Sequence, residues 1–144
     1  MPSHNEITYR ESVPQQEPFF KLFETTGWNQ GYGFEAGELH EAIKNSWYLV
    51  AAYDGDVLVG FGRVISDGVY HAFIVEMIIA PEYQGKGIGT AIMNQLVGKC
   101  RENRFPNVQL FCAKGKQEFY KRFGFEVRQD DAPGMQLNFP KARP

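Results

Sequence analysis

The strongest constraint on the fold is one short segment near the middle of the chain, residues 77–90, with the sequence MIIAPEYQGKGIGT. An apolar run ends at Pro81, and glycines at positions 85, 87 and 89 lead directly into a segment with helical periodicity. Glycine lets the backbone approach a ligand closely and adopt positive φ. The first N–H groups of a helix are unpaired and lie at the positive end of its dipole. The segment therefore predicts an anion-binding turn between a strand and a helix.

The chemistry of this turn suits a diphosphate, to which the side chains of Gln84 and Lys86 would add donors. Two common phosphate-binding motifs are excluded. The string GxxxxGK[ST] does not occur in the sequence. A GxGxxG fingerprint that begins at the first or second glycine would need glycine where the chain has Thr90 or Ile92.

Around this turn, apolar periodicity and turn signals predict an α+β domain. The pairs Asp54-Gly55 and Asp67-Gly68 separate three successive apolar strands. The strands are expected at residues 7–10, 47–53, 57–66, 69–80, 108–112, 125–129 and 135–139. Helices are expected at 14–26, 35–45, 88–102 and 115–123, and the stretch 27–34 is expected to be a loop. We therefore expect a mixed, mostly antiparallel central sheet of six to seven strands flanked by about four helices.

Length and composition favour one ordinary globular domain over residues 1–144, since 43% of the residues are hydrophobic and 22% are charged. The net charge of −2 argues against a nucleic-acid partner, which would call for a basic excess. Two cysteines without clustered partners, Cys100 and Cys112, predict neither a disulfide framework nor a metal site. No apolar run is long enough to span a membrane and no secretory signal is visible, so a cytoplasmic protein is expected.

Two segments together resemble the GNAT superfamily of acyl-CoA N-acyltransferases. Residues 84–89, QGKGIG, fit the [Q/R]xxGx[G/A] pattern of that superfamily's pyrophosphate loop. Residues 119–125, FYKRFGF, are similar to its FYxxxGF segment, and they lie about thirty residues downstream, after the expected helix and strand. The order of the elements also agrees, so the resemblance extends over roughly residues 7–139.

The resemblance implies acetyl-CoA as cosubstrate and no metal. In the superfamily the strand before the loop carries a bulge, and the pantetheine arm of CoA pairs with exposed backbone groups. By resemblance those groups belong to Met77, Ile78 and Ile79. The pyrophosphate and its surroundings fall on Gln84, Gly85, Lys86, Gly87, Ile88, Gly89 and Thr90, with Phe119 and Tyr120 as further contacts.

Two residues are candidates for proton transfer. By resemblance, Tyr120 is the general acid for the leaving thiolate, since a phenol with a pKa of ~10 stays protonated at neutral pH and a thiol has a pKa of ~8.5. The alternative is a packing aromatic. Glu76 is the only ionisable residue in the run 72–81 and is the candidate general base, with a structural ion pair as the alternative. Simple alternation puts it on one face with Ile74 and Ile78, unless a bulge changes the phase.

The acceptor side of the site is expected at residues 27–34, where Trp28, Tyr32 and Phe34 could wall a pocket for an amine or simply pack the helices. The favoured function is transfer of acetyl from acetyl-CoA to a primary amine of a small molecule, by direct attack in a ternary complex. A protein N-acetyltransferase, a catalytically silent CoA sensor and a non-enzymatic module are the alternatives. A homodimer through strand 135–139 stays open.

Overall fold

The computed structural model describes residues 6–139, and the chain divides into two compact units, Met1–Phe111 and Cys112–Pro144. The first unit contains a five-stranded sheet in the order β1-β2-β3-β4-β5. Its strands are β1 (Ile7–Arg10), β2 (Tyr48–Asp54), β3 (Val57–Ser66), β4 (His71–Ile79) and β5 (Asn107–Leu110). The first four strands are antiparallel and β5 runs parallel to β4, so the mixed, mostly antiparallel sheet is confirmed.

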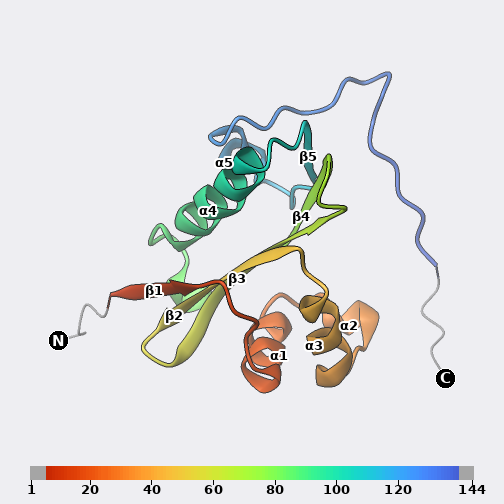
Figure 1. Ribbon diagram of the computed structural model, residues 1–144. Helices are drawn as coiled ribbons and strands as arrows, with labels where there is room; N and C mark the ends of the chain where they lie inside the picture. Colours follow the sequence, from red (N-terminus) through yellow and green to blue (C-terminus); the bar gives the residue numbers. More distant parts are fainter. Residues whose placement is uncertain (1–5, 140–144) are drawn as a thin grey trace. The chain divides into compact units, whose positions relative to one another are not determined.

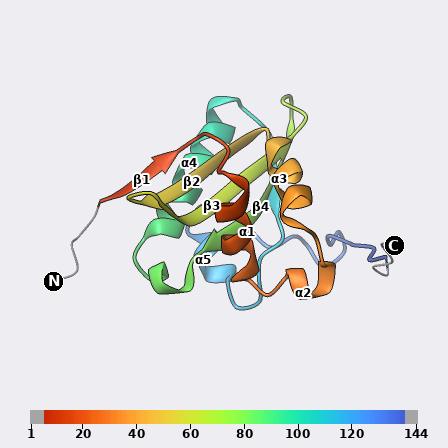
Figure 2. The ribbon, with the colours of Figure 1, turned by 90° about the horizontal axis from the view of Figure 1, so that it is seen from below.

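The described part of the first unit has four α-helices. They are α1 (Gln16–Glu24), α2 (Asn29–Tyr32), α3 (Ala36–Lys44) and α4 (Ile88–Glu102), with the short 3-10 turn η1 (Pro81–Tyr83) before α4. Of these, α1 and α4 pack on opposite faces of this sheet (Figure 1). Seen from below, α1 and α3 lie in front of the sheet and α4 lies behind it (Figure 2). The second unit contains one helix, α5 (Gln117–Lys121).

The helices form where the sequence supplies both an apolar side and an end signal. Helix α3 begins with a capping box in which Glu35 and Glu38 exchange side-chain and backbone hydrogen bonds. Helix α4 presents Ile92, Met93 and Leu96 to the sheet, and all three side chains are fully buried. On the other face the rings of Phe19 and Phe61 pack with centroids 4.8 Å apart. The core therefore has two apolar layers, one on each side of the sheet.

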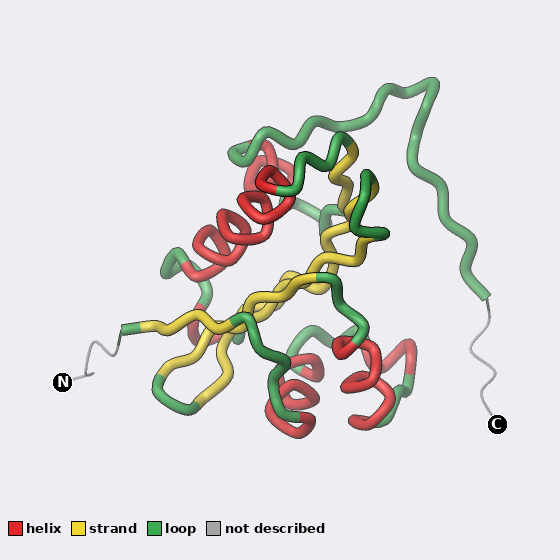
Figure 3. The backbone as a smooth tube through the Cα atoms, in the orientation of Figure 1, coloured by secondary structure: helices red, strands yellow, loops and turns green. Residues whose placement is uncertain are grey.

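Two expectations about elements are wrong. Residues 125–129 and 135–139 form no strand, so the described chain has five strands, where six to seven were expected (Figure 3). Most of their apolar side chains are exposed, Met135 to 87%, and Phe125 is half-buried. An alternating run of five residues becomes a strand only where a neighbouring strand supplies hydrogen bonds. The expected loop 27–34 contains α2, which brings the described α-helices to five.

Strand β4 carries a bulge opposite Gly62. Phe61 pairs with Ile78 and Arg63 pairs with Val75, so the single residue between them on β3 faces two residues on β4, Glu76 and Met77. Glu76 adopts φ 58°, in the left-handed region.

The bulge reverses the alternation of β4, because residues directly opposite one another share a face. Ile74 lies opposite Val64, whereas Ile78 lies opposite Phe61, three residues away along β3 and hence on the other face. Both isoleucines are nevertheless buried, since helices cover both faces. The expectation that Glu76 shares one face with both isoleucines is therefore wrong.

A test of this packing is the Gly62→Ala variant. A Cβ at residue 62 would lie 2.5 Å from Met77 Sδ, 2.9 Å from Ile92 Cγ2 and 3.0 Å from Leu96 Cδ1. We expect the variant to lose about 1–3 kcal/mol of unfolding free energy through overpacking, measured by urea denaturation. The control is Gly98→Ala in α4, where a Cβ meets nothing within 4 Å and a gain of up to about 1 kcal/mol is expected. Equal effects of the two substitutions would contradict this account of the bulge.

Candidate active site

The sheet splits beside the bulge. Pairing of β4 with β5 runs only from His71↔Asn107 to Ile74↔Leu110. From Val75 to Ile79, β4 has β3 on one side and no strand on the other among the described residues. Backbone N–H and C=O groups that point to this edge therefore have no strand partner there, and one group of the stretch, the carbonyl oxygen of Ile79, accepts a hydrogen bond from the Gln84 side chain. Met77, Ile78 and Ile79, the expected partners of the pantetheine arm, all lie on this stretch.

The stretch leads through η1 into the glycine turn, which has the backbone conformation that the sequence predicted. Gly85 and Gly87 have φ 77° and 85°, and a Cβ added at either would meet nothing within 4 Å. Glycine is thus required here by conformation, and the space above the turn is open. The first N–H groups of any α-helix lack intrahelical partners. In α4 the N-cap is Gly87, and no side chain caps this helix start, so these N–H groups of the first turn have no capping partner either. Gly89 and Thr90 belong to this first turn.

Side chains around the turn have different roles. Ile88 is buried and anchors the start of α4, whereas Lys86 is exposed. The Gln84 side chain, expected to bind phosphate, donates from Nε2 to the carbonyl oxygen of Ile79 at 3.1 Å. This bond joins the end of β4 to the glycine turn. Lys86 Nζ lies 5.2 Å from the centroid of the Tyr83 ring, within cation–π range.

A hydrogen bond beneath the turn was missed by sequence reasoning. The phenol of Tyr83 donates to Asp54 Oδ2 at 2.5 Å, and this bond raises the pKa of Tyr83 above its ordinary value. The other oxygen, Asp54 Oδ1, is buried and has no hydrogen-bond partner among the described residues. Asp54 ends β2, so the bond ties the β2–β3 turn to η1. The sequence suggested only a turn residue at this position.

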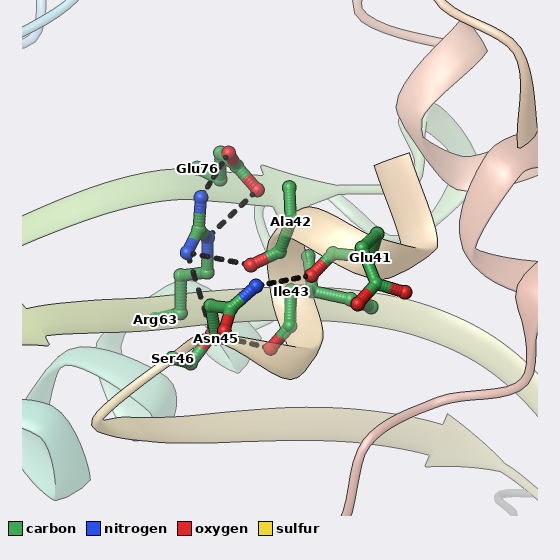
Figure 4. Close-up of polar contacts among 7 residues, drawn as sticks. All are labelled: Glu41, Ala42, Ile43, Asn45, Ser46, Arg63 and Glu76. Atoms are coloured by element: carbon green, nitrogen blue, oxygen red, sulfur yellow. Dashed lines mark hydrogen bonds and ion pairs between the residues drawn. The ribbon is translucent and has the colours of Figure 1, made fainter. Parts of the chain in front are cut away.

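The carboxylate of Glu76 is held by Arg63, a residue that the sequence analysis did not single out (Figure 4). Arg63 Nε donates to Oε2 at 3.2 Å and Nη2 donates to Oε1 at 3.0 Å. Arg63 Nη1 also donates to the carbonyl oxygen of Ala42 at 3.3 Å, near the end of α3. The guanidinium is buried, and the Glu76 side chain is 21% exposed. The alternative of an ion pair is thus what the structure shows, and the general-base role of Glu76 stays a prediction.

The aromatic residues expected on the acceptor side lie in and beside α2. Asn29 is buried, and its side-chain amide bonds to both the N–H and the carbonyl oxygen of Phe34, which fixes this connection. Trp28 packs edge-on against Phe23 with centroids 5.8 Å apart and remains 42% exposed. Tyr32 is 53% exposed and its ring lies 5.5 Å from that of Phe34. These side chains therefore pack the helices and also present aromatic faces to solvent.

The second unit contains the candidate acid. Tyr120 lies in α5 within a small aromatic cluster, its ring 5.0 Å from that of Phe119 and 6.4 Å from that of Phe125. Burial raises the pKa of the Tyr120 phenol above its ordinary value, with a smaller contribution from Cys112. The phenol is therefore protonated at neutral pH, as an acid must be. Its catalytic role stays a prediction.

Two further features bear on the class of protein. Within residues 6–139, no group of three His, Cys, Asp or Glu side chains is arranged to hold a metal ion. None of the helices in that range has the length and apolar character needed to cross a membrane.

Comparison with known proteins gives one family. The model of the acetyltransferase (GNAT) family matches residues 13–125. A GNAT-family acetyltransferase structure from Streptococcus pneumoniae superposes with a TM-score of 0.77 and 28% identity, covering 93% of this chain and 98% of that one.

Among curated relatives, the chain is 34% identical over 77 residues to "Serotonin N-acetyltransferase 2, chloroplastic" of rice (Oryza sativa subsp. japonica), covering 54% of this chain and 38% of the relative. It is 29% identical over 109 residues to "Histone acetyltransferase TAP1" of soybean (Glycine max), covering 68% and 47%. The chain thus spans about half or less of the length of these relatives.

Proposed function

The chain belongs to the GNAT family of acetyltransferases, and from this premise we propose that it transfers an acetyl group from acetyl-CoA to a primary amine of a small molecule. The observation that carries the proposal is the junction of two features of the first unit. The free edge of β4 between Val75 and Ile79 runs directly into the glycine turn and the uncapped start of α4. An elongated ligand with amide groups at one end and a diphosphate at the other matches this sequence of backbone groups.

The coenzyme would bind mostly to backbone. The amides of the pantetheine arm would extend the sheet at the edge formed by Met77, Ile78 and Ile79, as a peptide does when it adds to a strand. The diphosphate would accept hydrogen bonds from N–H groups between Gly85 and Thr90, at the positive end of the α4 dipole. Lys86 is exposed at the same turn and supplies a cation for the phosphates.

Acetyl transfer then requires one proton donation. The neutral amine attacks the thioester carbonyl, a C–N bond forms, the C–S bond breaks and the electron pair leaves with sulfur. Tyr120 would donate its phenolic proton to that sulfur, and solvent would return to the phenolate the proton that the amine nitrogen releases. Burial favours this role, since it raises the pKa of Tyr120 and keeps the phenol protonated.

The acceptor class rests on the aromatic faces of α2. Trp28 and Tyr32 present rings to solvent, and such rings bind a flat or cationic amine by stacking and cation–π contact. The names of the relatives point in both directions, one to serotonin and one to histone. The exposed rings favour the small amine, and a protein acceptor is the alternative outcome of an acceptor screen. Location in the cytoplasm and a homodimer stay predictions.

The coenzyme site is tested by Gly87→Trp. The substitution forces a bulky residue into φ 85° and fills the open space above the turn, so calorimetry should detect acetyl-CoA binding to the native protein and none to the variant. Gly27→Trp is the matched control, because Gly27 also has positive φ and open space but lies after α1. It should bind acetyl-CoA as the native protein does. If the native protein binds no acetyl-CoA, both the enzyme and the CoA sensor are excluded.

The acid is tested by Tyr120→Phe. We expect kcat to fall at least about tenfold with an unchanged dissociation constant for acetyl-CoA, because only the proton donor is removed. The control is Tyr70→Phe, because Tyr70 is an exposed residue of the turn between β3 and β4. This variant should have the kcat of the native protein.

The pH dependence offers a second check on the acid. An acid fails as pH rises through its pKa, and burial raises the pKa of Tyr120 above its ordinary value. The native kcat should therefore not decline through loss of this acid until the pH exceeds the ordinary pKa of a tyrosine, about 10. If the Tyr120→Phe variant keeps the native kcat, Tyr120 is not the acid. If the native protein binds acetyl-CoA but shows no turnover, the catalytically silent CoA sensor is favoured.

A further inference from the structure

Glu76 has a backbone conformation that is unusual for its place in the fold. Among residues 6–139, only Glu76 and Arg104 have positive φ without being glycine. Arg104 lies just after α4, where helices commonly end in this conformation. Glu76 lies inside a strand, where a left-handed residue with a side chain is unfavourable. A further interaction must hold it there.

Arg63 supplies that interaction. Nε and Nη2 of Arg63 each donate to one carboxylate oxygen of Glu76. This bidentate geometry is the strongest arrangement of an arginine with a carboxylate. The third nitrogen of Arg63 is fixed by the carbonyl oxygen of Ala42 and, at 3.5 Å, by Ser46 Oγ. The guanidinium thus joins β3, β4 and the end of α3, and its position is set by groups that do not belong to the bulge.

The opposite side of the bulge is fixed by packing. Gly62 leaves room for the side chain of Met77 beneath α4, where any Cβ at residue 62 would collide with it. The two bulge residues therefore project to opposite sides of the sheet, Glu76 to Arg63 and Met77 towards α4. Ion pair and packing together specify a bulge at this one place in β4.

The bulge begins two residues after the last residue of β4 that pairs with β5, Ile74. Beyond this point the β4 backbone has a free edge. We propose that the Arg63–Glu76 pair is a clamp that holds the bulge, and with it this edge, in the conformation that accepts the coenzyme arm. Glu76 is then a positioning residue and not the general base. The inference rests on the proposed function only for the identity of the ligand.

The ion pair also argues against proton transfer by Glu76. A protonated Glu76 would leave the Arg63 guanidinium buried without a counter-charge, which is strongly unfavourable. A base that must gain and release a proton in every catalytic cycle would break the clamp each time.

The test is rescue by glycine, in a background from which the buried cation has been removed. Arg63→Met combined with Glu76→Gly is compared with Arg63→Met combined with Glu76→Ala. The two proteins differ by one methyl group, and only glycine adopts φ 58° without strain. We expect the dissociation constant of the glycine protein for acetyl-CoA to lie within about threefold of the native value. The alanine protein should bind acetyl-CoA about tenfold more weakly than the glycine protein, which corresponds to ~1.4 kcal/mol of binding free energy.

Turnover separates the clamp from the base. If Glu76 is a positioning residue, kcat of the glycine protein at saturating acetyl-CoA stays within about tenfold of native and its pH profile keeps its shape, whereas loss of a general base costs about a hundredfold or more. Native coenzyme affinity with a hundredfold loss of kcat would overturn the inference. Equal, native-like affinity of the glycine and alanine proteins would overturn it as well.

A measurement without coenzyme separates this inference from the proposed function. Nuclear Overhauser contacts between residues 63 and 75 and between residues 61 and 78 report the register on each side of the bulge. The clamp predicts both sets in the native and glycine proteins and their loss or averaging in the alanine protein. Retention of both sets in all three proteins refutes the clamp. If the native protein binds no acetyl-CoA, the proposed function fails and these contacts still decide on the clamp.

Discussion

The bulge in β4 is the constraint on which the rest of the first unit depends. A regular strand from His71 to Ile79 would keep one set of side chains on one face throughout. The bulge instead turns Ile74 to one side of the sheet and Ile78 to the other, and both are buried because helices cover both faces. It also follows closely on the last residue that pairs with β5. The same local distortion therefore satisfies two apolar layers and lies where β4 no longer pairs with β5.

Elements with strong local signals could be predicted from the sequence. Strand β3 and helix α4 have the predicted bounds, because Asp-Gly turns enclose the strand and glycines precede the helix. The bulge could not be located this way. A strand buried on both faces is apolar throughout, so a change of phase leaves no trace in the pattern. The strands predicted at 125–129 and 135–139 were wrong for a related reason. Alternation of apolar and polar residues shows which side chains would share a face of a strand, but it does not show whether a neighbouring strand is present to pair with.

In the candidate site, too, features with local sequence signals were predicted, and features that depend on distant partners were not. The glycine turn could be predicted because the glycines that its conformation requires all lie within one short segment of the sequence. Arg63 and the Tyr83–Asp54 bond were missed because their partners lie 13 and 29 residues away. One signal was nevertheless available. Arg63 and Glu76 are lone charges in two apolar strands joined by a predicted turn. A two-residue turn at Asp67-Gly68 would place Arg63 opposite residue 72, whereas the longer connection in the structure places it opposite Val75, beside Glu76.

This division explains why the sequence indicates an anion-binding backbone turn, where we propose that the coenzyme binds, and does not identify the acceptor. A ligand held by backbone N–H and C=O groups imposes few side-chain identities, and those it does impose are glycines at fixed spacing. The proposed acceptor amine would be distinguished by side chains such as Trp28 and Tyr32, whose packing role alone would justify their presence. Aromatic residues in a helical connection are consistent with many acceptors, whereas left-handed glycines before an uncapped helix are consistent with few ligands other than an anion. The acceptor must therefore be identified by a screen of candidate acceptors, after binding of acetyl-CoA at the proposed coenzyme site has been measured.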